Sequence, residues 1–226
     1  MASKDQLTQF KYRILASALL CILFCTFAFP VQAYAKVNSN SIPDLNTFIE
    51  TVKDGNASTL RGVYVPNVMA LAIVQQPMGN PGYVSTTESV ATQFSIATEV
   101  GNVGLLAHNT AAGSFFSNIK SGDRIVLVYG DGHLESFMAK SIQRYQALNP
   151  LSPYSQFSDL EAQTKFSAEE LFNKVYRGEY HLTLQTCIEN NGNASWGRLF
   201  ILAEPVENSA KTVNALALLS NKKHID

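Results

Sequence analysis

The sequence predicts a mainly β domain in which short strands close, fully or partly, into a β-barrel. Many short apolar runs are separated by turn-forming residues, only two segments have the pattern of brief helices, and the connecting loops are long. The chain has 226 residues, of which 46% are hydrophobic. That length accommodates one domain with a sizeable core plus a targeting segment.

The elements follow from periodicity and turn signals along the chain. In the first half we expect a short helix at 41–53, strands at 62–66 and 70–74, a turn-rich loop at 75–82, a buried strand at 104–107, a loop or short helical turn at 111–119, and a hairpin of 124–129 and 133–143 around a turn at 130–132. In the second half we expect a loop at 147–157, a helix from Ser167, a strand at 180–187, a loop at 189–195 and a closing strand at 198–203. Glu170 follows Ser167 by three residues, which is the pattern of a capping box.

The N-terminal segment has the pattern of an export signal. Lys11 and Arg13 precede an uncharged apolar run, and small residues then lead to Ala35, where cleavage fits. An uncleaved run through Ala35 is also long enough for a membrane anchor, so both alternatives stay open. In either case the positive flank directs the rest of the chain outward. We therefore expect an extracytoplasmic protein, secreted after cleavage or anchored by its N-terminus.

The expected organisation is a signal peptide or membrane anchor at 1–35, a linker and helix at 36–61, a folded β domain at 62–206 and a C-terminal tail at 207–226. The formal net charge is −1, without the basic excess of nucleic-acid-binding proteins, so we expect no nucleic-acid partner. The cysteines and histidines lack the spacing of metal ligands. We expect no cofactor and no metal ion.

Cys187 is the one cysteine of the expected exported domain, because Cys21 and Cys25 lie in the N-terminal apolar run. A lone thiol in an exported protein is either a small buried hydrophobe or a reactive group. Side chains alternate between the two faces of a strand, and the strand at 180–187 is expected to end at Cys187, where a loop begins. That position would fix the thiol and leave it open to a substrate.

A reactive thiol needs a base or a positive neighbour, because a free cysteine has a pKa of about 8.5. Of the four histidines, His224 lies in the tail and His133 follows a hairpin turn. His181 lies on the strand of Cys187, six residues earlier, which is roughly 20 Å away. His108 remains as the partner, at the end of an apolar strand. Its alternative is a hydrogen-bonded loop residue without a catalytic role.

Arg198 lies on the strand that follows Cys187. Two antiparallel strands joined by a loop would bring both residues to the same edge. A guanidinium there can donate hydrogen bonds to a developing oxyanion or hold a substrate carbonyl. The alternative is a surface arginine paired with Glu189.

The segment Thr183-Leu184-Gln185-Thr186-Cys187, with His108 upstream and Arg198 downstream, resembles the sortases over about residues 63–205. These are cell-surface cysteine transpeptidases. The resemblance implies a closed or partly closed eight-stranded β-barrel with short helices in the connecting loops. It implies that Cys187 is the nucleophile that forms a thioacyl intermediate, that His108 is the acid/base, and that Arg198 stabilises the oxyanion. Thr186 and Asn109, which adjoin the nucleophile and the acid/base, are then expected to bind substrate.

The same resemblance implies the partners. The substrate would be an exported protein bearing a sorting motif, and the acceptor would be an amine of a cell-wall peptide or a lysine. The membrane would be a partner through the N-terminal segment if that segment is not cleaved. Two alternatives stay open: an exported thiol peptidase that transfers the acyl group to water, and a non-catalytic surface β-barrel that binds a partner.

Overall fold

The structure is a computed structural model that describes residues 42–206. The expected signal or anchor at 1–35, with Cys21 and Cys25, and the tail at 207–226 lie outside the described residues. Among the helices of residues 42–206, none combines the length and the apolar character that a membrane crossing requires.

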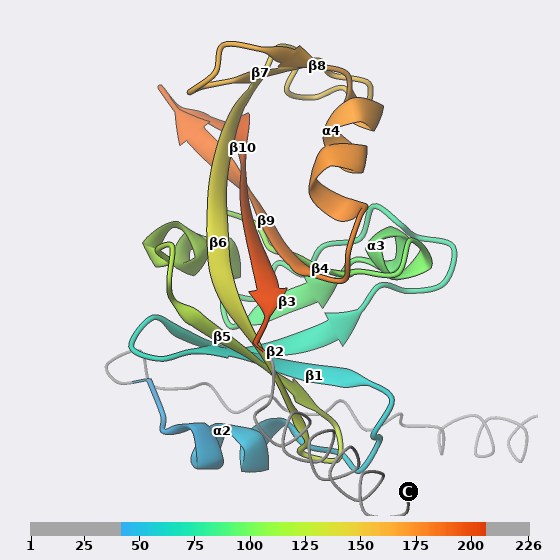
Figure 1. The fold of residues 1–226 in the computed structure, drawn as a ribbon, viewed down its shortest axis with the longest axis vertical. Helices are drawn as coiled ribbons and strands as arrows, with labels where there is room; N and C mark the ends of the chain where they lie inside the picture. Colours follow the sequence, from blue (N-terminus) through green and yellow to red (C-terminus); the bar gives the residue numbers. More distant parts are fainter. Residues whose placement is uncertain (1–41, 207–226) are drawn as a thin grey trace, which may run out of the picture. The chain divides into compact units, whose positions relative to one another are not determined.

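The described chain is mainly β (Figure 1). Its elements are, in order, α2 (Leu45–Val52), β1 (Leu60–Val65), β2 (Met69–Gln75), β3 (Val90–Gln93), α3 (Ser95–Glu99), β4 (Val103–Leu106), the 3₁₀ helix η1 (Ala112–Asn118), β5 (Arg124–Tyr129), β6 (Leu134–Ala147), β7 (Phe157–Asp159), β8 (Lys165–Phe166), α4 (Ala168–Tyr176), β9 (Leu182–Asn190) and β10 (Asn193–Pro205).

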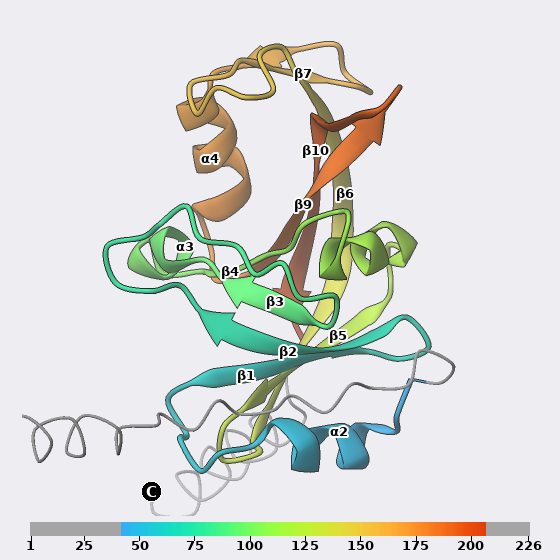
Figure 2. The same ribbon diagram turned by 180° about the vertical axis from the view of Figure 1, so that it is seen from behind.

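Eight of these strands form a closed β-barrel, as the sequence predicts. The strand order is β10-β9-β4-β3-β2-β1-β5-β6, and β10 pairs again with β6, which closes the ring. Strand β7 pairs with the last residues of β6 (Figure 2), and β8 pairs with β7, so these two strands extend the sheet beyond the ring. Most neighbours are antiparallel, but β2 pairs with β3 and β4 pairs with β9 in parallel. Closure leaves no free edge in the ring itself.

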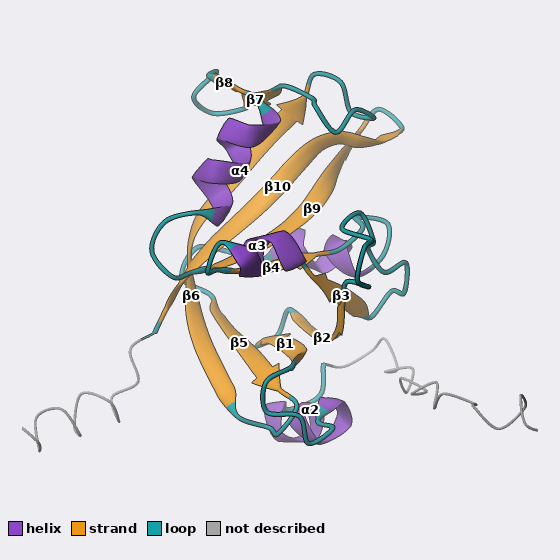
Figure 3. Cartoon of the chain, turned by 90° about the vertical axis from the view of Figure 1, so that its right-hand side faces the viewer, coloured by secondary structure: helices purple, strands orange, loops and turns teal. Residues whose placement is uncertain are grey.

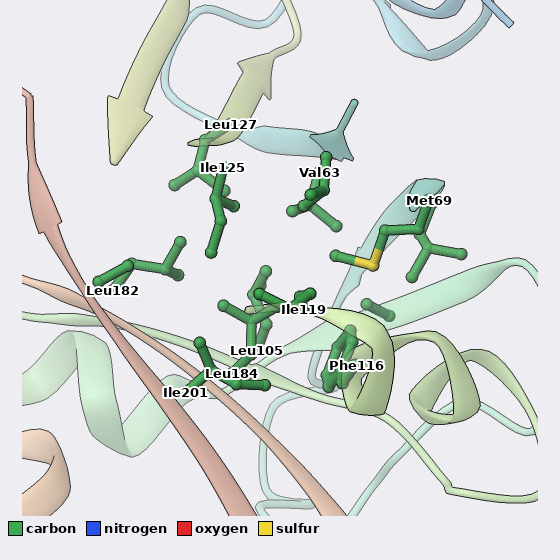
Figure 4. Close-up of a cluster of buried hydrophobic side chains, with 14 of the residues drawn as sticks. Val63, Met69, Leu105, Phe116, Ile119, Ile125, Leu127, Leu182, Leu184 and Ile201 are labelled. Atoms are coloured by element: carbon green, nitrogen blue, oxygen red, sulfur yellow. The ribbon is translucent and has the colours of Figure 1, made fainter. Parts of the chain in front are cut away.

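The barrel interior is an apolar core. Figure 4 shows Leu184 and Ile201 from the β9–β10 pair meeting Leu105 from β4 and Ile125 from β5. All four side chains are fully buried. The η1 helix closes the same core with Phe116, which is also fully buried. The core fixes the barrel positions of β4, β9 and β10, and the residues of chemical interest lie on β9 and β10 and just after β4.

Two helices cover the outside of the barrel. Helix α2 packs Phe48 and Val52 on β1, where Gly62 leaves room, since a Cβ there would come within 2.8 Å of the Phe48 ring. Helix α4 begins with the predicted capping box, in which Ser167 and Glu170 satisfy each other's backbone N–H groups.

Helix α4 lies beside β9 and β10 in Figure 3. Its buried Leu171, Val175 and Tyr176 pack with Tyr145 of β6 and Phe200 of β10 in a second apolar cluster. This cluster lies on the outer side of the sheet, because Phe200 alternates with the barrel residues Leu199 and Ile201.

The expected loop at 189–195 is wrong. Strand β9 continues past Cys187 to Asn190, and a tight turn of Asn191 and Gly192 leads directly into β10. Both turn residues have positive φ, of 51° and 81°, as a two-residue hairpin turn requires. The pairing is irregular between Asn193 and Gly197, so the extra residues form a bulge. Cys187 therefore lies inside a strand and not at the end of one.

Other expectations agree with the structure within a few residues. The helix at 41–53 is α2, the strand before His108 is β4, and the turn at 130–132 joins β5 to β6. His133 does belong to that turn, where it pairs with Asp131 and stacks on Tyr129. The elements β3, α3, β7 and β8 were not expected from the sequence, and all four are short.

Candidate active site

Cys187 and Arg198 are directly opposite each other on the paired strands β9 and β10. Directly opposed residues of an antiparallel pair point to the same face of the sheet. Leu184 on β9 points into the barrel, so Cys187, at odd spacing from it, points outward. Cys187 is half-buried and is a free thiol. The two strands therefore place Cys187 and Arg198 side by side in the sheet, with both side chains on the outside of the barrel.

His108 comes to the same place from β4. Strand β4 runs parallel to β9 with Leu106 level with Gln185, and the N–H of Ala107 donates to the Gln185 carbonyl at 3.2 Å. Strand β4 ends at Leu106, and His108 follows two residues later, so it continues from the strand that neighbours Cys187. Neighbouring strands are about 4.8 Å apart.

We call the outer-face positions His108, Gln185, Cys187 and Arg198 the Cys187 face. All four side chains are partly exposed. In residues 42–206 no hydrogen bond joins the side chains of His108, Cys187 and Arg198 to one another. The strand register pairs Cys187 with Arg198, and β4, which leads to His108, runs beside β9.

The loop after β4 holds His108 in place through backbone contacts. The His108 carbonyl accepts hydrogen bonds from the N–H groups of Ala111 and Gly113, both at 2.9 Å. A Cβ at Gly113 would come within 2.8 Å of that carbonyl oxygen, so only glycine fits the turn. Asn109 Nδ2 donates to the Ala194 carbonyl at 2.9 Å and thereby ties the loop to β10. Asn109, predicted to bind substrate, thus also links the histidine loop to the strand of the arginine.

Arg198 is held by the hairpin and by an aromatic ring. Its Nη1 donates to the carbonyls of Ser195 and Gly197, at 2.9 and 2.8 Å, and its guanidinium carbon lies 5.9 Å from the centre of the Phe157 ring. Glu189 is not its partner among the described residues, because that carboxylate accepts from the Gly192 N–H instead. The surface ion pair considered as the alternative for Arg198 does not form.

Thr186 does not lie on the Cys187 face. It alternates with Cys187 and is 4% exposed, and its hydroxyl lies against Gly113 beneath the histidine loop. That hydroxyl has no hydrogen-bond partner within the described residues. The sequence-based expectation of direct substrate contact therefore needs correction: strand alternation turns this side chain inward, where it supports the loop that follows His108.

Three residues that border the candidate site were not predicted from the sequence. Gln185 forms part of the Cys187 face, Tyr176 of α4 reaches it, and Phe157 of β7 stacks near Arg198. Gln185 had a signal in the sequence, since it is a polar residue on the outward side of an apolar strand. Tyr176 and Phe157 had none, because they reach the site only through the fold of segment 147–181.

Two aromatic hydroxyls under this face stay protonated at neutral pH. Burial, followed by the charges of Asp159 and Glu161, raises the pKa of Tyr145 to about 12. Burial alone raises the pKa of Tyr176 well above its usual range. Both are therefore hydrogen-bond donors under ordinary conditions.

A metal ion has no evident site in the described part of the chain, where no group of three or more histidine, cysteine, aspartate or glutamate residues converges. A cavity of about 350 Å³ lies elsewhere, between α2 and the outside of β5 and β6. Its lining includes Leu45, Val126 and Leu134 but none of the residues of the Cys187 face.

No family model matches the chain, and no curated protein matches it in sequence. Solved structures with a similar fold were found, and those described below are sortases. Listeria monocytogenes sortase A is 15% identical, with a TM-score of 0.43, over 68% of this chain and 89% of that one. A Clostridium perfringens sortase D5 transpeptidase is 12% identical, with a TM-score of 0.44, over 72% and 87%. Sortase C-1 from Actinomyces oris is 14% identical, with a TM-score of 0.44, over 65% and 73%.

Proposed function

We propose that this chain is a sortase-type cysteine transpeptidase with Cys187 as nucleophile. The observation that supports the proposal is the strand register, which pairs Cys187 with Arg198 and runs β4, the strand that leads to His108, beside β9. Two neighbouring strands of one closed barrel thus carry the thiol and the guanidinium, and the imidazole follows directly after the next strand. A structural thiol would need neither of the other two.

The proposed reaction has two steps. The Cys187 thiolate attacks a peptide carbonyl, the carbon–nitrogen bond breaks, and protonated His108 gives its proton to the leaving amine. This leaves a thioacyl group on Cys187 and a neutral His108. An incoming amine then attacks the thioester, His108 takes its proton, and the thiolate leaves. Charge on the carbonyl oxygen develops in both steps, and Arg198 stabilises it.

The substrate of this proposal is an exported protein with a sorting motif. The acceptor is an amine, from a cell-wall peptide or a lysine side chain. The reaction then takes place outside the cytoplasm, which agrees with the export pattern at residues 1–35. The membrane is a partner if that segment remains as an anchor.

A peptide library offered to the full-length chain in detergent, with and without several amines, tests this proposal. Background labelling is removed by the double variant Cys21→Ala/Cys25→Ala, so that a thioacyl adduct found by mass spectrometry belongs to Cys187. We expect amine-dependent transfer products and an adduct, and loss of both in Cys187→Ala with unchanged thermal unfolding.

Three other results would overturn parts of the proposal. Cleavage that gives only the free acid, whatever amine is added, identifies a thiol peptidase. Turnover that persists in Cys187→Ala removes the nucleophile. A Cys187 that neither turns over peptide nor changes its alkylation rate in His108→Ala identifies a non-catalytic binding domain.

A further inference from the structure

The hydroxyl of Tyr176, the last residue of α4, fixes the orientation of the Gln185 side-chain amide, two residues from the proposed nucleophile. The Tyr176 hydroxyl donates to Gln185 Oε1 at 2.6 Å. Tyr176 is 2% exposed, and its ring is packed by Phe94 and Phe172, with centroids 5.2 Å away in both cases. The donor is therefore rigid and stays protonated at neutral pH, because burial raises its pKa. Gln185 is the acceptor, so its Nε2 group points away from Tyr176.

The Gln185 Nε2 group has two N–H donors and no hydrogen-bond partner in residues 42–206. The chain contains a second tyrosine–glutamine pair, and there the glutamine Nε2 group does have a hydrogen-bond partner. The Tyr145 hydroxyl donates to Gln143 Oε1 at 2.7 Å, and Gln143 Nε2 in turn donates to the Ser141 hydroxyl at 3.0 Å. In both pairs a tyrosine hydroxyl donates to the glutamine Oε1, but only Gln143 has a partner for its Nε2 group.

The position of Gln185 on β9 puts this unpaired donor near Cys187. Gln185 lies two residues before Cys187 on the same face of β9, which is about 7 Å along the strand. Thr183, two residues earlier still, is fully buried and bonds to the Val175 carbonyl of α4. Gln185 is thus the last outward position of β9 before the helix covers the strand. A peptide that lies along β9 over Cys187 meets Gln185 about two residues from its scissile bond.

We propose that Gln185 Nε2 selects a hydrogen-bond acceptor in the side chain of the substrate residue that lies over it, about two residues from the scissile bond. The inference rests on the proposed function and specifies its substrate class. An amide, carboxylate or hydroxyl side chain pairs with the free N–H groups. An apolar side chain covers the same donors and leaves them unpaired, which disfavours it. A lysine side chain presents a second donor and is disfavoured for the same reason.

Matched peptides that carry glutamine, leucine or lysine at the positions flanking the scissile bond test the selection. For the wild-type chain, we expect kcat/KM for one such position to be about tenfold to a hundredfold higher with glutamine than with leucine. Gln185→Met removes the donor without adding charge and abolishes the preference. Gln185→Glu keeps the acceptor for Tyr176 but replaces the donor by a carboxylate oxygen, and so favours the lysine peptide.

Two further variants separate selection from structure. Tyr176→Phe keeps the ring and frees the amide to turn, and we expect it to reduce the preference severalfold while kcat for the best peptide changes little. Gln143→Glu alters the matched pair on β6 and leaves the preference unchanged. A preference retained in Gln185→Met, or lost equally in Gln143→Glu, overturns the inference.

Peptide binding to the Cys187→Ala chain keeps this inference distinct from the proposed function. We expect binding to show the same order of glutamine, leucine and lysine peptides, and Gln185→Met to remove that order. If wild-type turnover depends on Cys187 but Gln185 variants change neither turnover selectivity nor binding order, the inference fails and the proposed function stands. If no peptide binds or turns over in any variant, both fail.

Discussion

The two faces of β9 have opposite roles although their residues alternate along one strand. The inward side chains Leu182 and Leu184 are fully buried in the barrel core. The outward ones change along the strand: Thr183 is fully buried under α4, and Gln185 and Cys187 are half-buried beyond it. The inner face therefore supplies stability, and the outer face becomes available for chemistry where the cover by α4 ends.

The same contrast explains why the arrangement of the candidate site depends on strand register and not on contacts between its side chains. The inward residues hold β4 and β9 in register, and that register sets the places of His108 and Cys187. The side chains on the outer face then need few contacts with each other. Substitutions on the two faces should accordingly separate into effects on turnover and effects on unfolding.

The largest expected effect is on turnover. His108→Ala and Arg198→Ala should each lower kcat/KM by about 10²–10⁴-fold, because they remove proton transfer and oxyanion stabilisation. Thermal unfolding should change little, since both side chains are partly exposed. Steady-state kinetics and unfolding curves on the same preparations check this. Near-normal turnover in either variant would break the assignment of that residue.

The largest expected effect on stability comes from the inner face. Leu184→Ala should lower the free energy of unfolding by about 2–5 kcal/mol, because it leaves a cavity in the barrel core. Gln185→Met, its neighbour on the outer face, should cost less than about 1.5 kcal/mol. Urea unfolding of both variants measures the difference. Equal losses would show that the two faces are packed alike.

The third prediction concerns alkaline pH. Burial raises the folded-state pKa of Tyr176, and that of Tyr145 to about 12, so their contribution to stability is complete below pH ~10. It is lost as pH rises above the unfolded value toward the folded one. The unfolding free energy should fall above pH ~10, by up to about 1.4 kcal/mol per pH unit for a buried tyrosine. Tyr176→Phe should have a shallower fall, and identical slopes would contradict the role of its burial.

The smallest expected effect is an increase, not a decrease, in the free energy of unfolding. Thr186→Val replaces a buried hydroxyl that has no hydrogen-bond partner among the described residues by a methyl group of the same shape. The free energy of unfolding should rise by about 1 kcal/mol, with turnover unchanged. A steep loss of turnover at undiminished stability would instead restore the substrate contact predicted from sequence for Thr186.

Local patterns predicted much of the fold. The capping box at Ser167 and the apolar strand that ends before His108 are short-range features, and both are present in the structure. The end of β9 was misplaced, because Asn191 and Gly192 were interpreted as part of an open loop when their positive φ angles form a tight turn. The short strands β7 and β8 have too few residues for a periodic pattern.

Some residues of the candidate site could likewise be predicted from local sequence, and others could not. Residue type and chain order singled out Cys187, His108 and Arg198, because a lone thiol needs a base and a donor. Strand alternation could have placed Thr186 on the inner face, but the resemblance to a known motif suggested the opposite. Gln185 and its partner Tyr176 belong to different elements, so their contact depends on where α4 lies on the sheet.

By itself, the amino-acid sequence determined which residues are candidates for the proposed chemistry and which segments form most of the strands, since both depend on side-chain type and local periodicity. Only the tertiary structure decided that Cys187 pairs with Arg198 and that β4, which leads to His108, runs beside β9. That outcome depends on the register between β4, β9 and β10, which the burial of the barrel core fixes through residues far apart in the chain.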